Sequence, residues 1–170
     1  MGNDAIKLAL AGAVEYLAAH PAEARYRDAA ATATLRGGLV VDVAGVGGER
    51  ATTDMVASVG GSGTAPSPGW LFRAAVASCV ATLIAMRAAT EDVALEALEV
   101  RVDSESDDRG ILGIEPSIPA GPLSVRVTVS VKAPGHDAGR LRGIVEWGVA
   151  HCPVTDAVER AVPLEVDITV

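Results

Sequence analysis

The chain has 170 residues, of which 49% are hydrophobic and only 3% aromatic, and its formal net charge is −8. This length suits one domain with its own core, which Ala, Val, Leu and Ile must build. The negative charge and the scattered basic residues argue against nucleic acid or an anionic membrane as a partner. The longest uncharged apolar stretch, residues 74–86, is too short to span a bilayer.

The N-terminal residues lack the pattern of a secretory signal, because Asp4, Lys7 and Glu15 interrupt their apolar positions. We therefore expect a cytoplasmic protein. The chain has two cysteines, Cys79 and Cys152. In the cytoplasm we expect them to be reduced, reactive or simply buried, and not a permanent disulfide.

The first part of the chain is predicted to form a helix, a hairpin and a loop. Apolar residues recur at helical spacing over residues 4–20, and a His-Pro pair should end that helix. Residues 29–35 and 39–44 are predicted to be two strands around an Arg-Gly-Gly turn, with a possible third strand at 53–58. The glycine-rich stretch 60–68 should be a loop whose Ser-Pro pair opens the next helix.

The central element is predicted to be a helix from Pro68 to about Ala89, which is hydrophobic nearly all round. The remaining elements are expected to be a strand at 95–103, an irregular segment at 105–121, a strand at 122–132, a helix at 137–149, a short helix from Pro153 and a final strand at 162–170. This order predicts an α+β fold with antiparallel sheets. One small sheet cannot cover such a helix, so we expect a second subunit to bury part of it.

The other motifs in the sequence do not indicate a functional site. The run Gly45-Val46-Gly47-Gly48 begins like a dinucleotide fingerprint, but Arg50 occupies the position of the third glycine and no βαβ unit surrounds it. The three histidines lie far apart in sequence and no Cys-x-x-Cys pair exists, so we expect neither a metal nor a cofactor. The pair Asp107-Asp108 is best interpreted as part of a solvated turn.

The two cysteines admit two interpretations. Cys79 has apolar and small helical neighbours such as Val76 and Leu83. Such surroundings raise the pKa of a thiol, and lone buried cysteines often serve only as small packing residues. Chemistry at Cys79 would therefore require a cation, which an arginine of the early strands would have to supply. The residues alone leave both the structural and the reactive role open.

The pattern Pro68-x-x-Leu71-Phe72-x6-Cys79 after a glycine-rich loop, with His151-Cys152-Pro153-Val154 downstream, resembles the OsmC/Ohr family of thiol-dependent peroxidases. The resemblance spans about residues 29–170 as a single OsmC-like domain and leaves residues 1–28 as an N-terminal helical extension. It implies antiparallel sheets wrapped around long central helices in an intertwined homodimer.

The resemblance also implies roles for individual residues. Cys79 would attack an organic hydroperoxide, Cys152 would resolve the product as a disulfide, and an external dithiol would reduce that disulfide. The activating arginine should come from the first hairpin, where Arg36 matches best and Arg27 is the alternative. Active members usually carry Glu directly after the helix-opening proline, where this chain has Gly69. That departure favours a second possibility, a non-catalytic OsmC-like protein that binds an apolar small molecule at the dimer interface.

Overall fold

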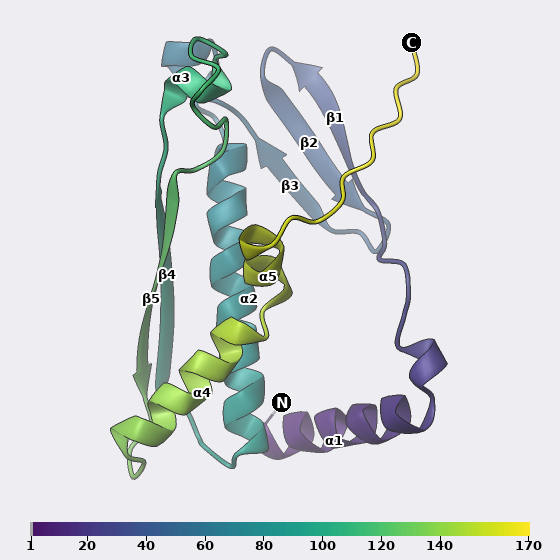
Figure 1. The fold of residues 1–170 in the computed structure, drawn as a ribbon, viewed down its shortest axis with the longest axis vertical. Coiled ribbons are helices and arrows are strands. Elements are labelled where there is room, and N and C mark those ends of the chain that lie inside the picture. Colours follow the sequence, from purple (N-terminus) through teal and green to yellow (C-terminus); the bar gives the residue numbers. More distant parts are fainter. Residues whose placement is uncertain (1) are drawn as a thin grey trace. The chain divides into compact units, whose positions relative to one another are not determined.

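A computed structural model describes residues 2–170. Its helices and antiparallel strands confirm the predicted α+β class (Figure 1). The elements in chain order are α1 (Asn3–Ala19), β1 (Ala31–Gly37), β2 (Val40–Gly45), β3 (Arg50–Thr53), α2 (Pro68–Thr90), β4 (Ala97–Glu105), α3 (Asp108–Ile111), β5 (Ser124–Lys132), α4 (Ala138–Ala150) and α5 (Pro153–Glu159), with short 3-10 turns at Pro21–Glu23 and Ala57–Val59. The chain divides into two compact units, one of Met1–Leu10 with Ala75–Val170 and one of Ala11–Ala74. The boundary expected at residue 28 remains a prediction.

The Ala11–Ala74 unit contains an antiparallel sheet in the order β1-β2-β3. Its first hairpin turns through Gly38, whose φ of 56° lies in the left-handed region that glycine adopts without strain. Asp42 on β2 lies opposite Thr34 of β1 and Thr52 of β3. Every residue of β1 is exposed, so β1 leaves an open edge on this sheet within its own chain.

The third strand differs from the prediction, because it spans Arg50–Thr53 and the segment 54–58, predicted to be its continuation from residue 53, forms no strand. The cause is Asp54, whose side chain is buried directly after the strand. Its carboxylate accepts hydrogen bonds from the amides of Met55, Ser62 and Thr64 and from the Thr64 hydroxyl, at 2.7–3.3 Å. These bonds fold residues 54–64 into a loop around one side chain, and they hold the pKa of Asp54 below its ordinary value.

The other unit contains a long antiparallel hairpin of β4 and β5, nine residues each. Exposed and half-buried residues alternate along both strands, as a sheet with one solvated face requires. In Figure 1 the hairpin runs beside α2. The half-buried positions, such as Val100 opposite Val129, share one face of the hairpin.

Helix α2 is buried along one stripe only, formed by Val76, Val80, Ile84 and Ala88 with Ala89 beside it. Its apolar sequence led us to expect burial on most faces, but the remaining positions are half-buried or exposed within one chain. By length and composition alone α2 could cross a membrane. Its buried stripe contacts α4 closely, since a Cβ atom on Gly148 would lie 2.6 Å from Ile84 Cγ1. This stripe is typical of a core helix that its own chain covers on one side.

The turn after α2 holds the N-terminal end of α1. Asp92 adopts a left-handed φ of 57°, and the Val93 amide donates to the Ala88 carbonyl at 2.8 Å, which ends α2. Lys7 Nζ pairs with the Asp92 carboxylate at 2.5 Å, and Asn3 Nδ2 donates to the Val93 carbonyl at 2.9 Å. The first turns of α1, which the sequence correctly predicted to be helical, are therefore anchored by polar contacts.

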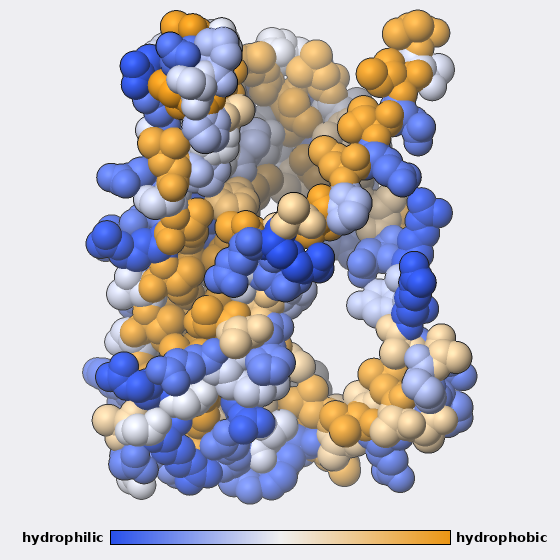
Figure 2. Space-filling view, viewed as in Figure 1, coloured by the Kyte–Doolittle hydropathy of each residue, from blue (hydrophilic) through white to orange (hydrophobic). Residues whose placement is uncertain are grey.

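The C-terminal segment corrects one prediction. Residues 161–170 form no regular secondary structure, although their alternating pattern predicted a strand at 162–170. Leu164, Val166 and Ile168 expose 71–87% of their surface. Figure 2 shows this segment as a hydrophobic run. The physical reason is that a strand needs a neighbouring strand, and none of the described residues pairs with this segment.

Candidate active site

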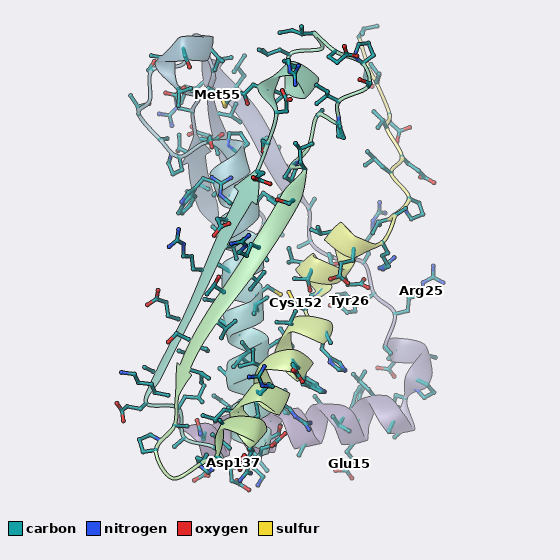
Figure 3. The ribbon with its side chains drawn as sticks, turned by 60° about the vertical axis from the view of Figure 1, so that its left-hand side comes forward. Glu15, Arg25, Tyr26, Met55, Asp137 and Cys152 are labelled. Carbon is teal, nitrogen blue, oxygen red and sulfur yellow. The ribbon has the colours of Figure 1, made fainter. Side chains whose placement is uncertain are left out.

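The two cysteines lie near each other in the fold, although they are distant in the sequence. Cys79 lies in the middle of α2 and is half-buried, whereas Cys152 precedes α5 and is completely buried. Figure 3 shows Cys152 at the junction between α4 and α5. Both thiols are free, and they interact closely enough that each shifts the pKa of the other. The fold therefore brings together two thiols from distant parts of the sequence.

A tight turn between α4 and α5 holds Cys152 in place. Helix α4 ends where the Cys152 amide donates to the Val149 carbonyl at 3.3 Å, and Pro153 then occupies the first position of α5. The hydroxyl of buried Thr155 lies 2.9 Å from both the Val149 and the Cys152 carbonyl oxygens. The backbone around Cys152 is thus fixed from both sides.

The surroundings shift the pKa values of the two thiols in opposite directions. Burial, followed by the hydrogen bond donated to Cys152, raises the pKa of Cys79, and the Val154 amide only partly offsets this. Burial by itself would also raise the pKa of Cys152. However, the hydrogen bond from Cys79 and the nearby amides of Thr155 and Val154 outweigh burial and lower it. The interaction between the two thiols therefore moves their pKa values apart.

Arg36 and Arg27, expected as activating groups, both lie in the Ala11–Ala74 unit and are exposed. The Arg36 guanidinium forms an ion pair with Asp42 across the β1–β2 hairpin. This contact, followed by the Thr52 hydroxyl, lowers the pKa of Asp42. Gly69 occupies the first turn of α2, and a Cβ atom there would have only the Arg73 side chain and the Ser67 hydroxyl within 4 Å, each at 3.8 Å. A larger residue would fit at position 69.

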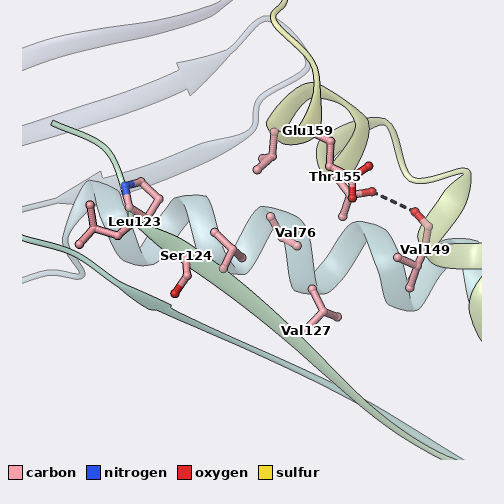
Figure 4. Close-up of a pocket in the computed structure, with 10 residues that line it drawn as sticks. Val76, Leu123, Ser124, Val127, Val149, Thr155 and Glu159 are labelled. Atoms are coloured by element: carbon pink, nitrogen blue, oxygen red, sulfur yellow. Dashed lines mark hydrogen bonds between the residues drawn. The ribbon is translucent and has the colours of Figure 1, made fainter. Parts of the chain in front are cut away.

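A pocket of about 290 Å³ opens beside the thiol pair (Figure 4). Its apolar wall comes from Val76 of α2, from Leu123, Val125 and Val127 at β5, from Val149 of α4 and from Val158 of α5. Val76 lies one helical turn before Cys79, and Thr155 contacts the backbone of Cys152. The lining of the pocket therefore includes one residue near each cysteine in the chain, although neither cysteine lines the pocket itself.

An aromatic stack flanks the site on α4. The His151 ring stacks on Trp147 with centroids 4.0 Å apart, and the Arg87 guanidinium carbon lies 5.1 Å from the Trp147 ring. His151 Nδ1 lies 2.8 Å from the Trp147 carbonyl oxygen, so one ring nitrogen is engaged locally. Across residues 2–170, no group of three or more His, Cys, Asp or Glu residues is placed to bind a metal ion.

Thr155 and Glu159 both line the pocket, but neither was predicted from the sequence to be a site residue. Thr155 is the third residue of α5, after the N-cap Cys152, and nothing in the sequence singles it out. Nothing in the sequence singles out Glu159, since an acidic residue at the end of a short helix is common on protein surfaces.

The fold and the thiol pair together define a two-cysteine α+β protein. Residues 61–167 match the family model described as OsmC-like protein. The chain belongs to this family. No curated protein matches the sequence.

Solved structures share the fold. The OsmC-like protein from Mycoplasma pneumoniae has a TM-score of 0.67 at 12% identity, with 81% of this chain and 91% of that chain covered. The organic hydroperoxide resistance protein OsmC from Legionella pneumophila has a TM-score of 0.58 at 21% identity, covering 79% and 90%. OhrB of Bacillus subtilis, an organic hydroperoxide resistance protein, has a TM-score of 0.52 at 22% identity, covering 79% and 93%. At these identities the likeness concerns the fold.

Proposed function

We propose that the protein is a thiol-dependent peroxidase that reduces organic hydroperoxides, with Cys79 as the attacking thiol and Cys152 as the resolving thiol. The observation that carries this proposal is that the two free thiols lie close enough for each to shift the pKa of the other. A sulfenic acid formed on one of them would have its resolving partner already in contact. The names of two proteins of the same fold, which refer to organic hydroperoxide resistance, support the substrate class.

Accessibility assigns the first step to Cys79, since Cys152 is completely buried. The Cys79 thiolate attacks the terminal oxygen of the hydroperoxide, the O–O bond breaks, and the alkoxide takes up a proton and leaves as an alcohol. Cys79 is thereby oxidised to a sulfenic acid. The Cys152 sulfur then attacks the Cys79 sulfur, a disulfide forms, and the hydroxyl group leaves as water.

The attacking thiolate must form at Cys79 although its surroundings raise the pKa of that thiol. Proton transfer along the hydrogen bond from Cys79 to the Cys152 thiolate produces this form, and a nearby cation would favour it. Arg36 is the proposed cation and Arg27 the alternative. For Arg36 to act, its guanidinium would have to exchange Asp42 for the thiolate.

The cycle closes when an external dithiol reduces the disulfide. Two successive thiol–disulfide exchanges regenerate both cysteines and release the oxidised dithiol. A reducing compartment such as the cytoplasm would supply that reductant. We further propose that the active form is a homodimer, since much of the apolar surface of α2 stays uncovered within one chain.

The test is turnover of cumene hydroperoxide with dithiothreitol as reductant. The wild-type protein should consume many equivalents of peroxide, and Cys79→Ser should consume none. Cys152→Ser should stop after oxidation of Cys79 to a sulfenic acid, detected by mass spectrometry after dimedone labelling. Arg36→Ala should slow the reaction, whereas Arg101→Ala, a change at an exposed arginine of β4, should not. Thiols that remain free under excess peroxide would contradict the proposal.

A second candidate function is binding of an apolar small molecule without chemistry. The raised pKa of Cys79 and the apolar pocket beside it favour this alternative. The same assay separates the two, because a binding protein would retain both thiols under peroxide while it still takes up an apolar ligand.

A further inference from the structure

We propose that Glu159 makes the pocket beside the thiol pair select uncharged apolar ligands over ligands of equal length that end in a carboxylate. This inference deepens the proposed function, because it names the kind of hydroperoxide whose organic group the pocket would accept. It would apply equally to the alcohol that leaves after reduction.

The lining of the pocket is apolar apart from three side chains. Ser124 and Thr155 are neutral, and the Thr155 hydroxyl is engaged with backbone carbonyl oxygens at 2.9 Å. Glu159, the last residue of α5, is the single charged residue that lines this pocket. Figure 4 shows Glu159 and Thr155 on α5 and Val76 on α2, three of the residues that line the pocket.

The negative charge of Glu159 is not balanced by a neighbouring cation. Across residues 2–170, Glu159 takes part in none of the ion pairs. The adjacent Arg160 is bound to Asp156 at 2.5 Å. Arg126 of β5 lies between Val125 and Val127, so its side chain points to the opposite face of the strand. A ligand in the pocket therefore meets one carboxylate, and none of the other described residues that line the pocket is charged.

This arrangement disfavours a second carboxylate. Like charges repel over distances shorter than the Debye length of about 8 Å at physiological ionic strength, and a ligand in the pocket lies within that range of Glu159. The formal net charge of −8 adds a weaker long-range repulsion of anions. Because Glu159 is exposed to solvent, we expect a discrimination of only about two- to fivefold from this residue.

The test measures binding without thiol chemistry. In a Cys79→Ser background, calorimetry with 1-octanol and with octanoate gives the ratio of the two affinities. The alcohol should bind more tightly. Glu159→Gln should reduce its advantage by about two- to fivefold, and Glu159→Lys should reverse the preference. Glu99→Gln, the same change at an exposed position of β4, should leave the ratio unchanged.

Several outcomes would overturn the inference. The inference fails if the Cys79→Ser protein binds both ligands equally or binds neither. It also fails if Glu159→Gln and Glu99→Gln give equal ratios of the two affinities. The result is separable from the proposed peroxidase activity. A protein without turnover can still show the preference for the alcohol, and an active peroxidase without that preference overturns only the role of Glu159.

Discussion

Cys152 and Cys79 differ in what surrounds each sulfur. Cys152 is completely buried yet has a lowered pKa, because the Cys79 hydrogen bond and two backbone amides outweigh the effect of burial. Cys79 is half-buried and has a raised pKa, from burial and from donating that same hydrogen bond. The interaction between the two thiols, burial and the backbone amides together separate the two pKa values, so the pair should lose its protons in two steps.

The first prediction concerns these two steps. Replacing Cys79 by Ala removes the hydrogen bond that stabilises the Cys152 thiolate, so burial should dominate and the pKa of Cys152 should rise from its lowered value toward or above the ordinary 9.0. The thiolate should then appear at higher pH. The ultraviolet absorbance of the thiolate, followed against pH, measures this shift.

Cys79→Ser is the matched control for this titration. A serine hydroxyl can still donate to the Cys152 sulfur, so the pKa of Cys152 should remain below that of the Cys79→Ala protein. Identical titration curves for the Ala and Ser variants would show that the contact between the side chains does not set the pKa of Cys152.

At the scale of elements, the contact of α4 with α2 holds the site together. Gly148 on α4 faces Ile84 on α2, and a Cβ atom at position 148 would lie 2.9 Å from the backbone nitrogen of Ile84. Backbone atoms cannot rotate away as a side chain can. The two helices therefore approach closely because position 148 lacks a side chain, and this approach brings the end of α4, with Cys152, to α2.

The second prediction tests this close approach. Gly148→Ala should force α4 away from α2 and lower the free energy of unfolding by about 1–3 kcal/mol, the usual cost of overpacking. Gly143→Ala on the same helix has nothing within 4 Å of its Cβ atom and should stabilise the protein by about 0.5–1 kcal/mol. Urea denaturation of both variants measures the difference. Equal stabilities would mean that α4 does not depend on the small size of residue 148.

For the whole molecule, we expect a partner chain to cover the apolar surface that one chain leaves exposed. The C-terminal segment exposes an alternating apolar row, and β1 is an open edge that is exposed along its whole length. Exposed edges and apolar rows of this kind are usually covered in the native assembly. A second copy of the chain, which the family resemblance also implies, would supply such cover.

The third prediction concerns this assembly. The full chain should form a dimer with an interface of more than about 2,000 Å² in total, as obligate dimers do. Deleting residues 162–170 removes the exposed apolar row and should weaken self-association, as seen by sedimentation velocity. Replacing Glu165 and Asp167 by Gln and Asn alters charge but keeps the apolar row, so dimerisation should persist. A monodisperse monomer of the full chain at micromolar concentration would contradict the expected dimer.

Local patterns in the sequence determined most of the secondary structure. Helical spacing located α1, α2 and α4, and alternation located β4 and β5, because each element buries one face and this leaves a periodic trace. The motif around Cys79 and Cys152 carried the family resemblance, which residues 61–167 confirm. These features depend on neighbours along the chain or on order and spacing, so they can be inferred without coordinates.

Contacts between distant residues were decided by the tertiary structure alone. The third strand ends at Thr53 because the buried Asp54 carboxylate accepts hydrogen bonds from amides up to ten positions later in the chain. The hydrogen bond of Cys79 with Cys152 and the placement of Glu159 at the pocket depend on how α5 packs near α2 and β5. The segment 162–170 has the pattern of a strand but no strand beside it. Periodicity in the sequence shows which face of a helix or strand is apolar. Only the tertiary structure decides which residues pack against that face.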